Sequence, residues 1–73
     1  MMNRIRKAFA QVGFEAPTDE NANLFEHGLD SLQVSLVVFE LEREFQQRLK
    51  LPEQLKEVFT SLAKIRKWIE EQS

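Results

Sequence analysis

Three stretches of the chain carry apolar residues at helical spacing, and this pattern constrains the fold more than any other feature. In residues 3–12 the apolar positions are Ile5, Ala8, Phe9 and Val12. The same spacing of three and four positions recurs from Ser31 to about Gln47, and again over residues 62–69. No segment shows the convincing alternation of apolar and polar residues that is typical of a strand. The chain is therefore predicted to fold as an all-α protein.

Local signals indicate where these helices begin and end. Gly13 is placed to form a left-handed cap at the end of the first helix. Asp30 is placed as the N-cap of the second helix, and Gln33, three positions later, is the expected partner in a capping box. Thr60 or Ser61 is placed to cap the last helix. These signals support the helices that the apolar spacing predicts.

The remaining segments complete a small bundle. Pro52 breaks the chain, and Glu53–Phe59 carries enough apolar residues for one short helix. Residues 15–30 form a long polar connection, in which Leu24 and Phe25 are expected to attach to the core. Three longer helices and a short third helix predict a four-helix bundle. A chain of 73 residues is expected to form one domain, covering residues 1–73.

Composition and charge argue against several classes of function. The chain has no cysteine, which excludes disulfides and thiolate catalysis, and its single histidine cannot build a histidine-rich metal site. The net charge of −2 is uneven, at +3 over residues 1–14, −7 over 15–44 and +2 over 45–73. A nucleic-acid-binding protein would present a basic face, so none is expected here. The acidic middle suits a partner with a basic surface, and an unevenly charged solvated surface explains it equally well.

No segment of the sequence is apolar enough to cross a membrane, and the start, MMNRIRKAFAQVGF, lacks the apolar core of a signal peptide. We therefore expect a cytoplasmic protein, and we expect it to be a monomer. Acidic pairs such as Asp19 and Glu20 lack the spacing of a cation-binding loop, so no metal site is predicted. We also expect no enzyme activity, because no nucleophile beside a base and no water-excluding pocket can be identified.

The stretch FEHGLDSLQ places Ser31 at the start of the second helix. Gly28 allows the chain to turn before Asp30, and the Ser31 hydroxyl is expected beside backbone N–H groups that have no partner within the helix. The positive end of the helix dipole also lies there, so the position favours a phosphate ester. Serine is common in first helical turns for structural reasons alone. The local pattern therefore leaves both interpretations open.

The longer stretch LFEHGLDSLQ resembles the attachment site of the acyl and peptidyl carrier proteins. Their pattern is Leu-Phe, a short spacer and Gly-x-Asp-Ser-Leu before an amphipathic helix, and Leu24-Phe25 and Gly28–Leu32 match it. LEREF at residues 41–45, the segment after Pro52 and TSLAKIRKWI at residues 60–69 extend the resemblance. It covers essentially the whole chain in order. The resemblance implies the four-helix fold of acyl carrier proteins.

The resemblance also implies a function. Ser31 would receive 4′-phosphopantetheine from coenzyme A through a magnesium-dependent phosphopantetheinyl transferase, and Asp30 and Leu32 would complete the attachment site. The thiol at the end of this arm would hold an acyl, aminoacyl or peptidyl cargo as a thioester. A ligase or acyltransferase would load the cargo, and a synthase or transferase would receive it.

The helix after Ser31 departs from the pattern of bacterial fatty-acid carriers, which usually have a continuous acidic face there. We therefore expect a stand-alone carrier of a specialised pathway of lipid or natural-product biosynthesis. The residues expected to contact partners are Gln33, Val34, Leu36, Glu40 and Arg43. Val34, Leu36 and Phe39 would form an exposed apolar patch there, unless they pack under the long connection. The alternative function is an unmodified helical interaction module with the carrier fold.

Overall fold

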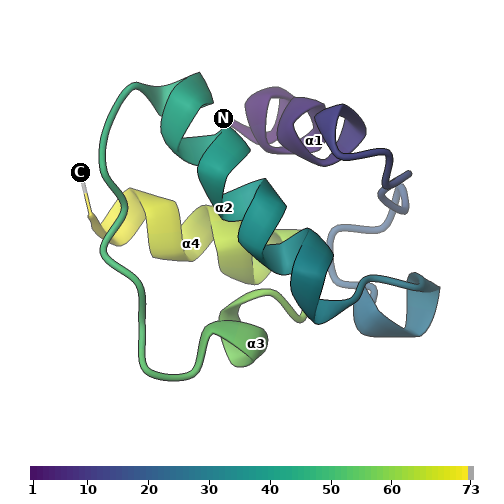
Figure 1. Ribbon diagram of the computed structural model, residues 1–73. Coiled ribbons are helices and arrows are strands. Elements are labelled where there is room, and N and C mark those ends of the chain that lie inside the picture. The colour runs from purple at the N-terminus through teal and green to yellow at the C-terminus, as the bar shows by residue number, and fades with distance from the viewer. Residues whose placement is uncertain (73) are drawn as a thin grey trace.

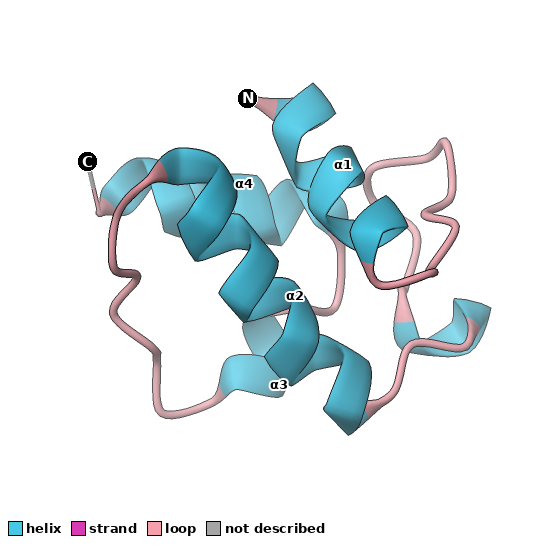
Figure 2. Cartoon of the chain, turned by 45° about the horizontal axis from the view of Figure 1, so that its top comes forward, coloured by secondary structure: helices cyan, strands magenta, loops and turns pink. Residues whose placement is uncertain are grey.

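The computed structural model describes residues 1–72 as a small helical bundle (Figure 1). The elements in chain order are α1 (Met2–Gln11), a 3-10 turn η1 (Phe25–His27), α2 (Ser31–Phe45), α3 (Leu55–Val58) and α4 (Leu62–Glu71). Figure 2 shows helices and loops only, and no strand occurs in this part of the chain. The predicted all-α bundle with a short third helix is confirmed. The expected end of the domain, at residue 73, lies outside the described residues.

The helix boundaries differ from the prediction where capping is weak or the backbone turns. The third helix covers four residues instead of Glu53–Phe59, and its N-cap residue, Gln54, makes no side-chain capping bond. α2 ends two residues earlier than predicted, because Gln46 adopts a left-handed conformation with φ 53°. The 3-10 turn η1 was not predicted, since three residues are too few to show helical spacing.

The capping residues predicted for α2, for α4 and for the end of α1 are present in the structure. Asp30 Oδ1 accepts a bond of 2.8 Å from the Gln33 backbone N–H, and Gln33 Oε1 accepts one of 3.2 Å from the Asp30 N–H, which is the predicted capping box. Of the two candidates for capping α4, Ser61 is the cap and accepts a bond from the Lys64 N–H. Gly13 has the predicted left-handed conformation, with φ 80°.

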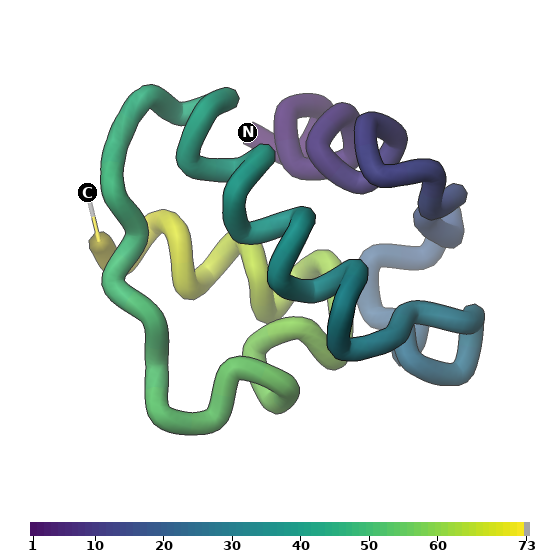
Figure 3. The backbone as a smooth tube through the Cα atoms, in the orientation of Figure 1, coloured from purple at the N-terminus to yellow at the C-terminus, as the bar shows by residue number. Residues whose placement is uncertain are grey.

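A row of four aromatic rings runs through the core. α1 packs against α2 and α4, and α3 packs against α4, in the arrangement that Figure 3 traces. The rings of Phe14 and Phe9 lie 5.5 Å apart, those of Phe9 and Phe59 lie 6.4 Å apart, and those of Phe59 and Trp68 lie 5.9 Å apart. All four side chains are buried. We call these residues the aromatic row, and their rigid rings leave the core densely filled.

The long connection before α2 is fastened to the rest of the bundle. Leu24 is fully buried, as predicted, and its backbone N–H donates a bond of 2.7 Å to the Thr60 carbonyl. The Arg6 guanidinium donates to the carbonyls of Pro17 and Thr18 at 2.8 and 3.0 Å. Phe25 is half-buried against the core. These contacts fix the segment that leads into the start of α2.

Residues 46–54 form a second long connection, which joins α2 to α3 along one side of the bundle (Figure 1). The Trp68 indole N–H donates a bond of 3.3 Å to the Lys50 carbonyl, and the Lys50 backbone N–H donates to the Gln72 side chain. Leu49 is buried, whereas Leu51 remains exposed. The Leu49 backbone N–H also donates a bond of 3.0 Å to Glu42 Oε2, so three polar contacts and one buried leucine hold this connection against α2, α4 and the core. None of the described helices is long and apolar enough to span a membrane.

Candidate functional site

Ser31 is the first residue of α2 and is exposed to solvent. Its hydroxyl has no hydrogen-bond partner within residues 1–72, although its carbonyl oxygen accepts a bond of 3.4 Å from the Ser35 hydroxyl. The N–H groups of a first helical turn have no acceptor inside the helix. In α2, the Asp30 carboxylate accepts the hydrogen bond of one of these groups, the Gln33 backbone N–H. The Ser31 hydroxyl is thus free to react and lies at the positive end of the longest described helix.

The backbone before Ser31 is held by a turn. Gly28 has φ 99°, a conformation that side-chain-bearing residues rarely adopt, and its N–H donates a bond of 3.2 Å to the Phe25 carbonyl. Leu29 is buried, and its N–H donates a bond of 3.1 Å to the Leu24 carbonyl. The turn places Asp30 in the extended conformation that an N-cap requires. The turn at Gly28 and Leu29 therefore fixes the position of the Ser31 backbone at the start of α2.

Removal of the Asp30 carboxylate should destabilise the start of α2. The variant Asp30→Ala loses the bond to the Gln33 N–H, and the expected loss in the free energy of unfolding is about 0.5–2 kcal/mol. Urea unfolding followed by circular dichroism measures this change. Asp30→Asn is the matched control, because asparagine also caps helices well. Equal stability of Asp30→Ala and the parent chain would contradict the role of the cap.

A surface groove of about 630 Å³ lies beside Ser31. It is lined by Ser31, Val34 and Ser35 of α2 and by residues 53–57. The position of Ser35, one helical turn after Ser31, follows from the sequence spacing. The contribution of residues 53–57 was missed, because no local signal shows which part of the chain packs beside the start of α2. The groove gives room beside the hydroxyl for an attached group.

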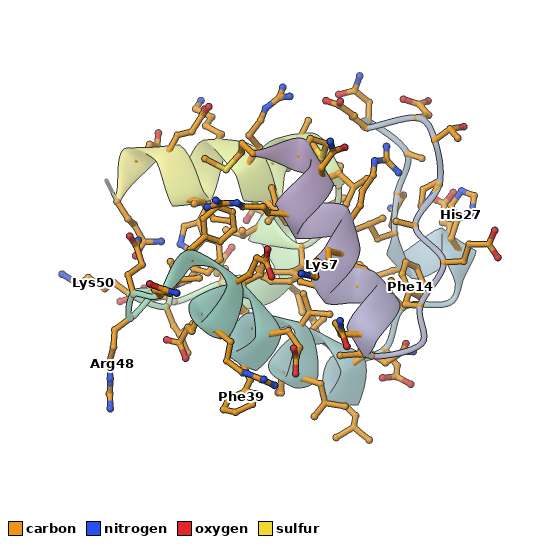
Figure 4. The ribbon with its side chains drawn as sticks, turned by 90° about the horizontal axis from the view of Figure 1, so that it is seen from above. Lys7, Phe14, His27, Phe39, Arg48 and Lys50 are labelled. Atoms are coloured by element: carbon orange, nitrogen blue, oxygen red, sulfur yellow. The ribbon has the colours of Figure 1, made fainter. Side chains whose placement is uncertain are left out.

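The outward face of α2 carries an apolar stripe, which we define as Leu32, Leu36 and Phe39. All three side chains are exposed, and Phe39, at 58%, projects from α2 away from α1 in Figure 4. The Arg43 guanidinium lies 5.9 Å from the centre of the Phe39 ring and 3.4 Å from Glu40 Oε2. The predicted docking residues Leu36, Glu40 and Arg43 thus lie on neighbouring positions of α2. Exposed apolar side chains with charged neighbours are typical of an interface core and rim.

Of the two alternatives for Val34, an exposed docking residue or a packed one, the structure shows the packed one. Its side chain is 3% exposed, because Val34 lies on the same helical face as the buried Val37, Val38 and Leu41. Gln33 is half-buried and its side-chain oxygen is engaged in the capping box. Leu36 and Phe39 are exposed, so these two do not pack under the long connection. The apolar surface of α2 therefore includes Leu32 in place of Val34.

Other candidate chemistry is not gathered at this site. His27, labelled in Figure 4, is exposed in η1. It does not belong to the residues that line the groove beside Ser31. Within residues 1–72, no group of histidine, aspartate and glutamate side chains is placed to hold a metal ion. The site consists of a hydroxyl, a capped helix start, a groove and an apolar stripe. On a small helical bundle, this arrangement places an exposed hydroxyl next to space for an attached group and next to an apolar surface.

Comparison with known families gives the class of the protein. The family model described as phosphopantetheine attachment site matches residues 3–69. The match covers most of the chain, so the protein belongs to this family and binds phosphopantetheine as a carrier protein. Proteins of the family carry 4′-phosphopantetheine covalently and are generally not enzymes. No curated protein and no solved structure matches the chain significantly.

Proposed function

We propose that Ser31 is the attachment residue and that the protein carries acyl or aminoacyl cargo as a thioester. The observation that supports this most is the exposed, unpartnered Ser31 hydroxyl at the capped start of α2. On modification, a phosphate ester forms at Ser31 Oγ, the hydroxyl proton leaves, and the adenosine bisphosphate part of coenzyme A departs. The attached arm supplies the thiol that this chain, which has no cysteine, lacks.

The surrounding residues suit an anionic group on Ser31. Asp30 fixes the first turn of α2, and the free N–H groups and helix dipole of that turn favour a phosphodiester. Leu32 is exposed immediately beside Ser31 and is accessible to a transferase. The groove formed with residues 53–57 offers space for the arm. The intact mass after incubation with coenzyme A and a transferase tests the assignment.

Partners are proposed to dock on the outward face of α2. The apolar stripe begins beside Ser31, so an enzyme covering it would reach the attached arm. Glu40 and Arg43 provide charge at the edge of this surface. The proposed partners are a phosphopantetheinyl transferase, a loading ligase or acyltransferase, and a downstream synthase or transferase. An α2 face with an apolar stripe favours a specialised biosynthetic pathway over general fatty-acid synthesis. We include a monomeric, single carrier domain and a cytoplasmic location, where coenzyme A is supplied, in the proposal.

The docking proposal predicts that Leu36→Glu impairs modification. A carboxylate in the middle of the apolar stripe would be desolvated against a partner, so kcat/KM of a broad-specificity phosphopantetheinyl transferase should fall about tenfold. Leu51→Glu is the matched control, because Leu51 is 55% exposed and Leu36 is 46% exposed. Leu51 lies on the connection after α2, outside the stripe. Equal rates for the two variants would remove the support for docking on α2.

The alternative is an interaction module that binds partners without modification. The exposed apolar stripe supports it, since such a surface serves any helical binding module. The two functions differ in their need for Ser31. An interaction module would bind its partners equally well after Ser31→Ala, and it would gain no mass from coenzyme A.

A further inference from the structure

The packing of the core next to the groove and the charges at the edge of the groove indicate the class of cargo. This inference rests on the proposed attachment at Ser31. Two apolar side chains, Val34 and Leu55, line the groove. Val34 is buried and Leu55 is packed against the core cluster. A long alkyl chain would have to pass these side chains to enter the bundle. What it would meet inside decides whether the cargo is held within the bundle or outside it.

A buried aromatic ring lies directly after α3. Phe59 directly follows α3 and is fully buried. Its ring lies 6.4 Å from that of Phe9 and 5.9 Å from that of Trp68, on the aromatic row. An aromatic side chain has two rotatable bonds and moves only as a rigid plate. A chain that needed the space of the Phe59 ring would have to displace it from between the rings of Phe9 and Trp68.

The fully buried core also contains no methionine among residues 1–72. Methionine is the flexible residue that adapts to irregular spaces in a core. The two methionines of this chain are Met1, which is exposed, and Met2, which is half-buried at the edge of the cluster. The largest fully buried residues are Phe9 and Phe59. The interior is therefore poorly suited to opening for an alkyl chain.

The outer rim of the groove is charged. Glu53, Lys56 and Glu57 are exposed, and none of them forms an ion pair with another residue in the range 1–72. A long alkyl chain lying across this rim would remove water from these charges without replacing it by a polar partner. A short or polar acyl group would leave them hydrated.

We propose that the cargo is a short acyl group, aminoacyl groups included, which rests in the surface groove between α2 and residues 53–57 and does not enter the bundle. The wide class of long-chain fatty acyl cargo is thereby excluded. Phe59 is the side chain to which we assign this limit, because its ring is fully buried directly after α3 and is held between the rings of Phe9 and Trp68.

The test compares cargo of different length on the same chain. A broad-specificity phosphopantetheinyl transferase transfers acetyl-, butyryl- and octanoyl-phosphopantetheine from the corresponding coenzyme A thioesters. The rate at which hydroxylamine cleaves each thioester then reports whether the cargo is sheltered. We expect the octanoyl and acetyl rates to agree within about threefold, since sheltering requires the bundle to open. A larger protection of the octanoyl thioester would overturn the inference.

The variant Phe59→Leu provides the control for the method. Removing the ring opens space in the interior, so the octanoyl thioester should become protected relative to the acetyl thioester in this variant. Equal protection in the variant and the parent chain would show that Phe59 does not set the limit. A parent chain that accepts no acyl-phosphopantetheine at all would contradict the proposed function instead. The two failures are therefore distinguishable.

Discussion

Ser31→Ala is expected to abolish the gain in mass that follows incubation with coenzyme A, Mg²⁺ and a broad-specificity phosphopantetheinyl transferase. The variant lacks the oxygen that would form the phosphate ester, so none of the chain should be modified. The fold should persist, because the Ser31 hydroxyl has no partner within residues 1–72 and Asp30 still caps the helix. Intact mass spectrometry measures the modification, and circular dichroism measures the helix content.

Ser35→Ala is the matched control for this prediction. Ser35 lies one turn after Ser31, is exposed and lines the same groove. Ser35 lies inside the range of α2 and not at its start, and its hydroxyl already donates to the Ser31 carbonyl. Ser35→Ala should therefore gain the same mass as the parent chain. If the folded parent chain stays unmodified with several transferases, or if Ser31→Ala is modified, the assignment of Ser31 is wrong. The first outcome would favour the interaction module.

Phe59→Ala should cause a large loss of stability. Its ring is fully buried between Phe9 and Trp68, and removing such a ring costs about 3–5 kcal/mol in the free energy of unfolding. A domain of 73 residues has about 4–11 kcal/mol in total. The variant is therefore expected to be marginally stable or unfolded at room temperature. Urea unfolding followed by circular dichroism measures the loss.

Phe39→Ala is the matched control, because it removes an aromatic ring that is exposed and not buried. Phe39 is 58% exposed on α2, where its ring contacts the Arg43 guanidinium. Substitutions at such surface positions usually change stability by less than about 0.5 kcal/mol. If Phe39→Ala lowered the free energy of unfolding as much as Phe59→Ala, burial in the aromatic row would not explain the effect at Phe59.

The features that were predictable from the sequence are those that depend on neighbours in the chain. The spacing of apolar residues identified α1, α2 and α4, because one face of each helix must be buried. The Asp30–Gln33 capping box and the left-handed Gly13 also depend on local geometry. The start of α2, and with it the position of Ser31, was predictable for the same reason.

The features that were not predictable depend on packing between distant segments. The groove beside Ser31 needs residues 53–57 to lie next to α2, and no local pattern specifies that contact. The spacing of α2 also left open whether Val34, Leu36 and Phe39 are exposed or packed. The structure shows that Leu32, not Val34, belongs to the outward surface. Only the direction in which α2 faces the core decides between them.

Trp68 gives the protein an optical probe of its own. It is the single tryptophan of the chain, it is buried, and its indole N–H is bonded to the Lys50 carbonyl at the connection between α2 and α3. Indole emission moves to longer wavelengths when water reaches the ring. Trp68 does not line the groove beside Ser31. Its fluorescence should therefore report the detachment of residues 46–54 from the core in the natural sequence, without a dye or an introduced label.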